Sequence, residues 1–157
     1  PTELFDDMGK HLAKVGAEFG STTGRPRRCG WFDAVAARRA ILNNGVTGLC
    51  VTKLDVLDGL ECLKVCVGYR LEGEVVNSTP VLVDQYADCE PVYEELPGWR
   101  TSTVGITDAA SLPKAASAYL ARVESILNVP VDMISTGPDR HHNIVIRHPF
   151  DQADAPP

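Results

Sequence analysis

The sequence has 157 residues, of which 44% are hydrophobic and 23% charged, and its formal net charge is −6. These values predict a soluble globular domain of ordinary size with a sizeable core. The acidic charge argues against nucleic acid as a partner, because phosphate binding needs a broad basic surface. No stretch approaches the roughly 18 apolar residues of a membrane span. We therefore expect a cytoplasmic chain with no membrane or nucleic-acid partner, in which any anion site is local.

Five cysteines, an odd number at irregular spacing, favour a reducing compartment. We expect most of them to be buried free thiols. Cys62 and Cys66 lie four residues apart in an expected strand, so a metal or redox role is the alternative, but no set of Cys and His ligands accompanies them. The sequence opens with Pro1 rather than Met, and we expect a processed or truncated product. The cysteines are Cys29, Cys50, Cys62, Cys66 and Cys89.

Apolar residues at helical spacing predict a first helix over residues 2–15, with Thr2 as its N-cap and Gly16 at its end. A second helix is expected over residues 33–44, with Asp33 in its first turn. An arginine-rich loop therefore connects two helices.

The middle of the chain has the pattern of strands. Residues 48–52 form a short apolar run without alternation, which predicts a parallel strand buried on both faces. Residues 61–70 and 74–76 flank a Glu-Gly pair and predict a hairpin. The segment PVYEELPGW, residues 91–99, resembles an edge strand that ends in a Pro-Gly turn.

The last third of the chain predicts an amphipathic helix over residues 113–127, with Pro113 in its first turn. Strands are expected at 131–135 and 143–147, and only the tail 151–157 has a composition typical of disorder. The whole pattern predicts an α/β fold, with a mixed, mostly parallel sheet flanked by helices and with a β-hairpin.

The loop GSTTGRPRRCG, residues 20–30, gathers groups suited to a small anionic ligand. Two of its glycines allow a ligand to approach the backbone, and its hydroxyl groups can hydrogen-bond to one. Its three arginines supply forks that match carboxylates or phosphates. The alternative is an exposed basic loop that pairs with acidic neighbours. These residues are Gly20, Ser21, Thr22, Thr23, Gly24, Arg25, Arg27 and Arg28.

The segment TKLD, residues 52–55, follows the expected buried strand directly, at the edge of the sheet where ligands of α/β proteins bind. An Asp carboxylate can accept hydrogen bonds from guanine N1–H and from its exocyclic amine, whereas adenine presents a lone pair at N1. Lys53 can lay its methylene stem over a base. The alternative is an ordinary strand end.

The segment STGPDR, residues 135–140, also follows an expected strand. Its Thr136-Gly137-Pro138 stretch is expected to expose backbone N–H groups that could meet a guanine O6 or a ribose. The alternative is a plain hairpin turn. Two strand-end loops and an arginine loop together favour a ligand site over three unrelated turns.

The motifs GSTTGRPRRCGWFDAVAARRA, TKLDVLDGL, PGW and STGPDR occur in this order, and together they resemble the C-terminal part of the adenylosuccinate synthetase family. The resemblance runs along essentially the whole chain, over a C-terminal region 1–150 followed by the tail. It implies part of a P-loop-NTPase-like fold and a dimeric, cytoplasmic ligase of AMP biosynthesis. In that family GTP, IMP and L-aspartate are joined through 6-phosphoryl-IMP to give adenylosuccinate, with Mg²⁺ required.

The resemblance implies roles for three groups of residues. The aspartate-binding loop would be Ser21, Thr22, Thr23, Gly24, Arg25, Pro26 and Arg27, with Arg25 also reaching IMP and Arg27 lying near the GTP phosphates. The guanine-binding residues would be Lys53, Leu54 and Asp55 in one loop and Ser135, Thr136 and Gly137 in the other.

Two departures from the family pattern limit these roles. Pro26 stands where many members carry another arginine, and no glycine-rich phosphate loop of the GDEGKGK type occurs. The family's catalytic Asp and its partner His therefore have no match, and Mg²⁺ would be bound mainly by residues outside this chain. We expect no catalytic residue and no metal ligand here. The four histidines, which we expect to be surface or packing residues, are His11, His141, His142 and His148.

The leading hypothesis is therefore the C-terminal part of such a ligase, inactive by itself. A non-catalytic module that binds guanine nucleotides or anions is the alternative. A structural domain with vestigial loops is a third reading, which predicts no nucleotide binding.

Overall fold

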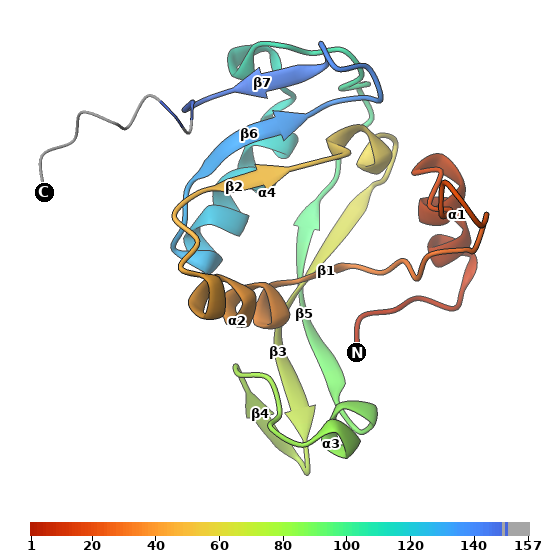
Figure 1. Ribbon diagram of the computed structural model, residues 1–157, viewed down its shortest axis with the longest axis vertical. Coiled ribbons are helices and arrows are strands. Elements are labelled where there is room, and N and C mark those ends of the chain that lie inside the picture. Colours follow the sequence, from red (N-terminus) through yellow and green to blue (C-terminus); the bar gives the residue numbers. More distant parts are fainter. Residues whose placement is uncertain (149, 151–157) are drawn as a thin grey trace, which may run out of the picture. The chain divides into compact units, whose positions relative to one another are not determined.

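The computed structural model describes residues 1–148 and 150 (Figure 1), so the expected tail 151–157 lies outside the described residues. The chain forms two compact units, each made of two segments. The first unit comprises residues 1–43 and 62–96, and the second comprises residues 44–61 together with the described residues from 97 onward. The region expected over residues 1–150 is thus built from two units.

Helix α1 of the first unit spans Asp7–Val15, and the prediction of Thr2 as its N-cap is wrong. Asp6 is the cap, because its carboxylate accepts a hydrogen bond from the Gly9 N–H at 3.0 Å. Gly16 ends the helix as predicted, and its N–H donates to the Leu12 carbonyl at 2.9 Å.

Helix α2 spans Ala34–Asn44 and begins one residue after its predicted start. Asp33 precedes the helix, and its Oδ1 accepts from the Ala36 N–H at 3.0 Å. Its Oδ2 accepts from the Tyr69 hydroxyl at 2.7 Å. Burial and this carboxylate raise the pKa of Tyr69 well above its usual range.

The sheet of the first unit contains β1 (Phe32–Asp33), β3 (Cys62–Leu71), β4 (Glu74–Val76) and β5 (Glu90–Pro97), and the short helix α3 (Val83–Ala87) precedes β5. Strand β3 pairs with β1 in parallel and with β4 in antiparallel, and β5 also pairs with β3. The predicted hairpin is confirmed: Glu72 and Gly73 both have positive φ, 51° and 85°, as a tight two-residue turn requires.

The cysteines divide between the core and the surface. Cys66 and Cys89 pack with Val35 and Tyr69 in the core of the first unit. Burial raises the pKa of Cys66 to about 11. Cys50 and Cys62 are exposed, so the prediction of buried thiols is wrong for these two. All five cysteines are free thiols.

The sheet of the second unit has the order β2 (Leu49–Val51), β6 (Val131–Ser135), β7 (Asn143–Val145). Strand β6 is parallel to β2 and antiparallel to β7. The prediction that β2 is buried on both faces is wrong, because Cys50 is exposed and β2 pairs only with β6 among the described residues. Both parallel and antiparallel pairings occur, and the predicted α/β class with mixed strand pairing, helices and a hairpin is confirmed. The strands form two sheets rather than the single, mostly parallel sheet that was expected.

Helix α4 of the second unit spans Lys114–Leu127 and lies along one face of this sheet (Figure 1). The amphipathic helix predicted over residues 113–127 is confirmed: its apolar side chains are buried, except that Ile126 is only partly buried. Pro113 is the N-cap residue and not part of the first turn. Two 3₁₀ helices complete the unit: η1 (Leu54–Leu57) follows β2, and η2 (Ala109–Ser111) precedes α4. No helix among the described residues combines the length and the apolar character that a membrane crossing requires. The buried residues of α4 are Ala116, Tyr119, Leu120, Val123 and Leu127.

Candidate functional site

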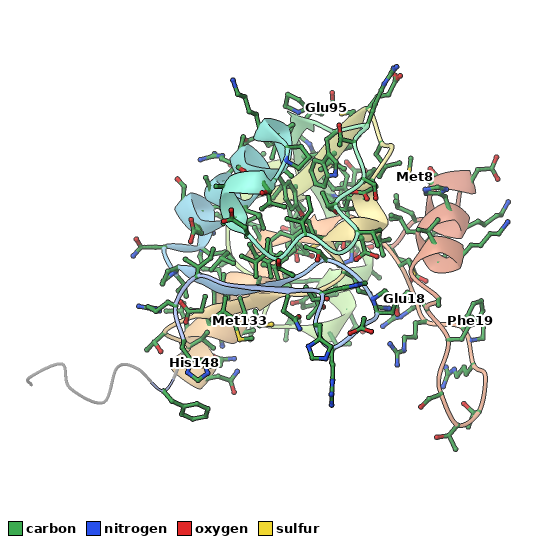
Figure 2. All side chains as sticks on the ribbon, turned by 90° about the horizontal axis from the view of Figure 1, so that it is seen from above. Met8, Glu18, Phe19, Glu95, Met133 and His148 are labelled. Atoms are coloured by element: carbon green, nitrogen blue, oxygen red, sulfur yellow. The ribbon has the colours of Figure 1, made fainter. Side chains whose placement is uncertain are left out.

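The arginine-rich loop folds as a small hairpin that projects beyond Glu18 and Phe19 (Figure 2). Phe19 and Pro26 form an antiparallel bridge, and the Gly20 N–H donates to the Arg25 carbonyl at 2.8 Å. Gly24 closes the turn at φ 65°, a value that favours glycine. The residues at the tip, 21–24, are exposed, so their hydroxyl groups and the amides of residues 21–23 are accessible to a ligand, whereas the Gly24 N–H donates to the Gly20 carbonyl at 2.8 Å.

The three arginines of this loop differ in their surroundings. Arg27 pairs with Glu18 at 3.1 Å, and Arg28 pairs with Glu3 at 3.7 Å. No acidic side chain of the described residues pairs with Arg25. Exposed ion pairs contribute little to stability, so an anionic ligand can compete for these guanidinium groups.

The second predicted segment turns sharply out of β2. Lys53 has a left-handed backbone conformation, with φ 61° and ψ 40°, and its side chain is exposed. Leu54 is only 1% exposed, so its side chain anchors the turn in the core. Leu54 can therefore contribute to a ligand site only through its backbone.

One carboxylate oxygen of Asp55 lacks, within the part of the chain that the structure describes, the hydrogen bond that buried polar atoms normally have in a folded protein. Its Oδ1 is buried, and no described residue hydrogen-bonds to it. Buried carboxylate oxygens almost always have a hydrogen-bond donor, because an unpartnered one loses its hydration without compensation. The Asp55 carboxylate therefore has a buried acceptor oxygen for which the described residues supply no hydrogen-bond donor.

The two strand-end loops meet in the second unit. Because β2 and β6 are parallel, their carboxyl ends lie at the same edge, with Val51 opposite Ile134. The Ser135 hydroxyl accepts from the Lys53 N–H at 3.5 Å and donates to the Gly137 carbonyl at 3.4 Å. The structure therefore brings the TKLD and STGPDR segments together, as the sequence predicted.

Thr136 is fully buried and is not available to a ligand. Its N–H donates to the His142 carbonyl at 2.9 Å, and its hydroxyl lies 2.8 Å from the Ile106 carbonyl. The prediction that Thr136-Gly137-Pro138 exposes a row of N–H groups is therefore wrong, since Thr136 uses its own and Pro138 has none. Gly137 retains an N–H without a partner among the described residues.

His142 packs beside this loop, and sequence reasoning did not connect it with the site. Its Nδ1 is buried without a hydrogen-bond partner among the described residues. A Cβ on Gly137 would lie only 2.6 Å from this nitrogen, so no larger residue fits at position 137 without displacing the imidazole. The signal in the sequence was the glycine itself, since a close approach of backbone to a ring demands one.

Asp58 is the other residue that sequence reasoning missed. It lies three residues after Asp55, and its two carboxylate oxygens accept four hydrogen bonds from the segment 99–103. The motif TKLDVLDGL contained this aspartate, but nothing local in the sequence indicates partners more than 40 positions away.

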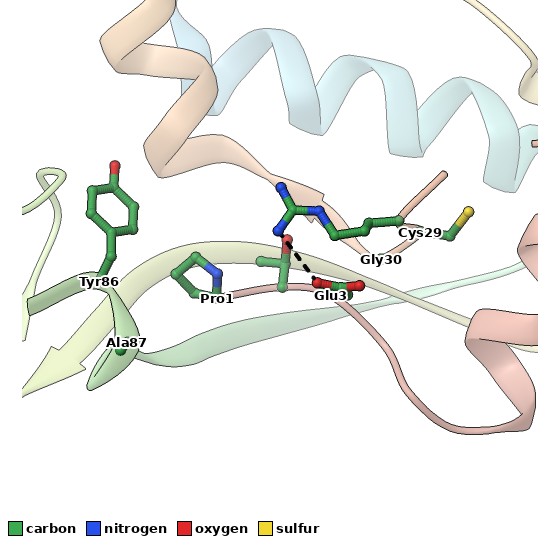
Figure 3. A pocket seen from close by; sticks show the side chains of 8 residues that line it. Pro1, Glu3, Cys29, Gly30, Tyr86 and Ala87 are labelled. Carbon is green, nitrogen blue, oxygen red and sulfur yellow. Dashed lines mark ion pairs between the residues drawn. The ribbon is translucent and has the colours of Figure 1, made fainter. Parts of the chain in front are cut away.

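A pocket in the first unit is lined in part by the end of the arginine-rich loop, residues 28–30 (Figure 3). Arg28 and Glu3 form an ion pair there, and Cys29 and Tyr86 also line it. None of the residues carried over from the family pattern contributes to this pocket, so we assign it no function.

The described residues do not fit a Mg²⁺ site. They include no group of three or more His, Cys, Asp or Glu side chains placed to hold a metal ion. Divalent magnesium needs carboxylate and other oxygen ligands in octahedral geometry.

The chain is an α/β protein in which two candidate ligand-binding loops follow neighbouring parallel strands, β2 and β6. A model of the family described as adenylosuccinate synthetase matches residues 1–144. The chain belongs to this family, as its motifs predicted.

Individual relatives agree with the family match. The adenylosuccinate synthetases of Thioalkalivibrio sulfidiphilus and Azotobacter vinelandii are 63% and 62% identical to the chain, each over 96% of it. A solved structure described as fully ligated adenylosuccinate synthetase from Plasmodium falciparum matches 93% of the chain with a TM-score of 0.89 and 37% identity. In each case the chain spans 35% of the relative's length.

Proposed function

We propose that this chain is the C-terminal part of a GTP-dependent ligase that joins IMP and L-aspartate to form adenylosuccinate in AMP biosynthesis. The full-length protein would act in the cytoplasm as a homodimer. The observation that carries the proposal is the buried Oδ1 of Asp55, which has no hydrogen-bond partner among the described residues and is held beside a second strand-end loop. A carboxylate in this position favours a ligand that presents hydrogen-bond donors.

Guanine supplies such donors. We propose that the Asp55 carboxylate accepts from N1–H and from the exocyclic amine, while the stem of Lys53 covers the base. The Gly137 N–H, which has no partner among the residues that the structure describes, would donate to O6. Adenine would present a lone pair at N1 and an amine in place of O6, so both contacts would be lost. Leu54, Ser135 and Thr136 would hold these two loops in place through their packing and hydrogen bonds.

The arginine-rich loop would bind the dicarboxylate substrate. We propose that Ser21, Thr22 and Thr23 hold L-aspartate with their exposed hydroxyl groups and amides, next to Arg25, and that Gly24 forms the turn that presents them. Arg25 would also reach IMP, and Arg27 would leave Glu18 to approach the GTP phosphates. These guanidinium groups would offset the repulsion among three anionic ligands, which must meet for the reaction to proceed. Pro26 would fix the loop backbone between the two arginines.

The remaining chemistry would come from the part of the relatives that this chain does not span. That part would carry the general base that takes a proton from IMP, the phosphate loop and the ligands of Mg²⁺. The chain alone would therefore bind but not catalyse.

A chimera tests the proposal. It joins the part of the Thioalkalivibrio sulfidiphilus relative that precedes the matched segment to Pro1 of this chain, and the intact relative serves as the control. We expect adenylosuccinate formation that requires GTP, IMP and L-aspartate together. A folded chimera that binds GTP but forms no product would favour the non-catalytic module. A folded chimera that binds neither nucleotide nor aspartate would exclude both the ligase and the non-catalytic binding module.

A further inference from the structure

One carboxylate, that of Asp58, organises the segment that follows strand β5. Its Oδ1 accepts from the Trp99 indole N–H at 2.7 Å and from the Thr103 hydroxyl at 2.8 Å. Its Oδ2 accepts from the Thr103 backbone N–H at 2.7 Å and from the Ser102 hydroxyl at 3.1 Å. Hydrogen bonds to a charged acceptor are about twice as strong as neutral ones, so this cluster is rigid.

The same residue is tied to the predicted guanine-reading turn. The Asp58 N–H donates to the Asp55 carbonyl at 3.1 Å at the end of η1. Trp99 and Thr103, the residues that Asp58 holds, are 4% and 0% exposed. Asp58 thus joins the turn that carries Asp55 to a neighbouring segment that two buried side chains anchor.

That neighbouring segment continues to the second loop. The Ile106 N–H donates to the Thr103 carbonyl at 3.1 Å, and the Ile106 carbonyl accepts from the Thr136 hydroxyl at 2.8 Å. The Gly105 N–H also donates to the Thr136 carbonyl at 3.1 Å. A connected series of hydrogen bonds therefore runs from Asp55 through residues 99–106 to the loop of Gly137.

We propose that Asp58 is a positioning residue for guanine recognition, and that it sets the spacing between Asp55 and Gly137 through the segment 99–106. This inference rests on the proposed function. Asp58 does not contact the base; it holds the two groups that do. The segment 99–106, to which the family pattern assigned no role, is then a third part of the nucleotide site.

Asparagine cannot replace Asp58 in either orientation of its amide. The hydroxyl groups of Thr103 and Ser102 can rotate, but the Trp99 indole N–H and the Thr103 backbone N–H can only donate. Each carboxylate oxygen accepts one of these two fixed donors. One donor must therefore face the amide NH₂ group, and the segment must shift to relieve the conflict.

The test uses Asp58→Asn in the chimera, with GTP and with ITP, which lacks the exocyclic amine. We expect KM for GTP to rise about tenfold, and the preference for GTP over ITP to fall. KM for IMP and for L-aspartate should change less than twofold. Asp108→Asn is the matched control, because Asp108 is exposed and caps η2 with a single oxygen, which asparagine retains.

A purely structural role gives a different result. A lower melting temperature with an unchanged KM for GTP and an unchanged GTP preference would overturn the inference. Thr103→Val is the second variant in case Asp58→Asn does not fold, since it removes one hydrogen bond to Asp58 and keeps the backbone N–H. It should raise KM for GTP about threefold, and an unchanged value would also overturn the inference.

Asp55→Asn, measured in parallel, separates this inference from the proposed function. If Asp55→Asn raises KM for GTP and the Asp58 variant does not, only the positioning role fails. If neither variant alters the use of GTP, the proposed guanine site fails as well.

Discussion

Asp55→Asn in the chimera is the substitution with the most specific expected outcome. The amide keeps one acceptor oxygen, but it replaces the other with a donor that cannot meet a second N–H of guanine. The buried Oδ1 has no hydrogen-bond donor among the described residues, so no contact within them can replace the missing ligand contact. We therefore expect KM for GTP to rise while the fold is retained.

The size of the effect follows from one lost hydrogen bond to a charged group, which contributes about 1.5–3 kcal/mol. At about 1.4 kcal/mol for each tenfold change, this corresponds to a rise in KM for GTP of about 10- to 150-fold. Hypoxanthine lacks the exocyclic amine, so ITP already lacks one of the two donors. The preference for GTP over ITP should therefore fall towards one in the variant.

The assay compares initial rates of adenylosuccinate formation at varied GTP and varied ITP, with IMP and L-aspartate saturating. Asp7→Asn is a control with the same chemical change at a side chain that is 98% exposed. It should change neither KM for GTP nor KM for ITP. A folded Asp55→Asn variant that keeps the normal KM for GTP and the normal preference over ITP would refute the assignment of Asp55.

Three other outcomes are expected. Arg25→Leu should raise KM for L-aspartate and for IMP about 10- to 100-fold with little effect on KM for GTP, whereas Arg28→Leu should leave all three nearly unchanged; equal effects of the two would contradict the role of Arg25. Gly137→Ala should raise KM for GTP because its Cβ would lie 2.6 Å from His142 Nδ1, and the double variant with His142→Ala should recover part of the loss; no recovery would exclude this collision as the cause. The Cys66 thiol should resist iodoacetamide at pH 8 until the protein unfolds, because burial raises its pKa to about 11. Rapid labelling of the native protein, read by mass spectrometry, would contradict the burial of this thiol. Since the unfolded thiol ionises near pH 9.0, the contribution of Cys66 to the free energy of unfolding should be complete below that pH and should decrease as the pH rises towards 11.

The parts of the fold that follow from local rules could be predicted from the sequence. The apolar periodicity over residues 113–127 gave both the helix and its buried face. The Glu72-Gly73 pair gave the hairpin, because a tight turn between two strands needs residues that tolerate positive φ. Errors arose where two local signals competed: Thr2 and Asp6 can both cap a helix, and the hydrogen bond to Gly9 selects Asp6.

The candidate site could be predicted only in part. The TKLD and STGPDR segments were expected to contribute to one ligand site because each follows a strand directly, and the structure brings them together at the shared edge of two parallel strands. The burial of Thr136 and the four hydrogen bonds of Asp58 depend on residues 30 to 45 positions away. Such pairings are set by tertiary packing, which neither periodicity nor spacing along the chain reveals.

A crystal structure of the chimera with GDP would test the account most directly. We expect both oxygens of Asp55 within hydrogen-bond distance of guanine N1 and its exocyclic amine, and the Gly137 N–H directed at O6. Trp99 and Thr103 should remain hydrogen-bonded to Asp58. A guanine base bound away from both strand-end loops, with the Asp55 Oδ1 still unpartnered, would contradict the proposed site.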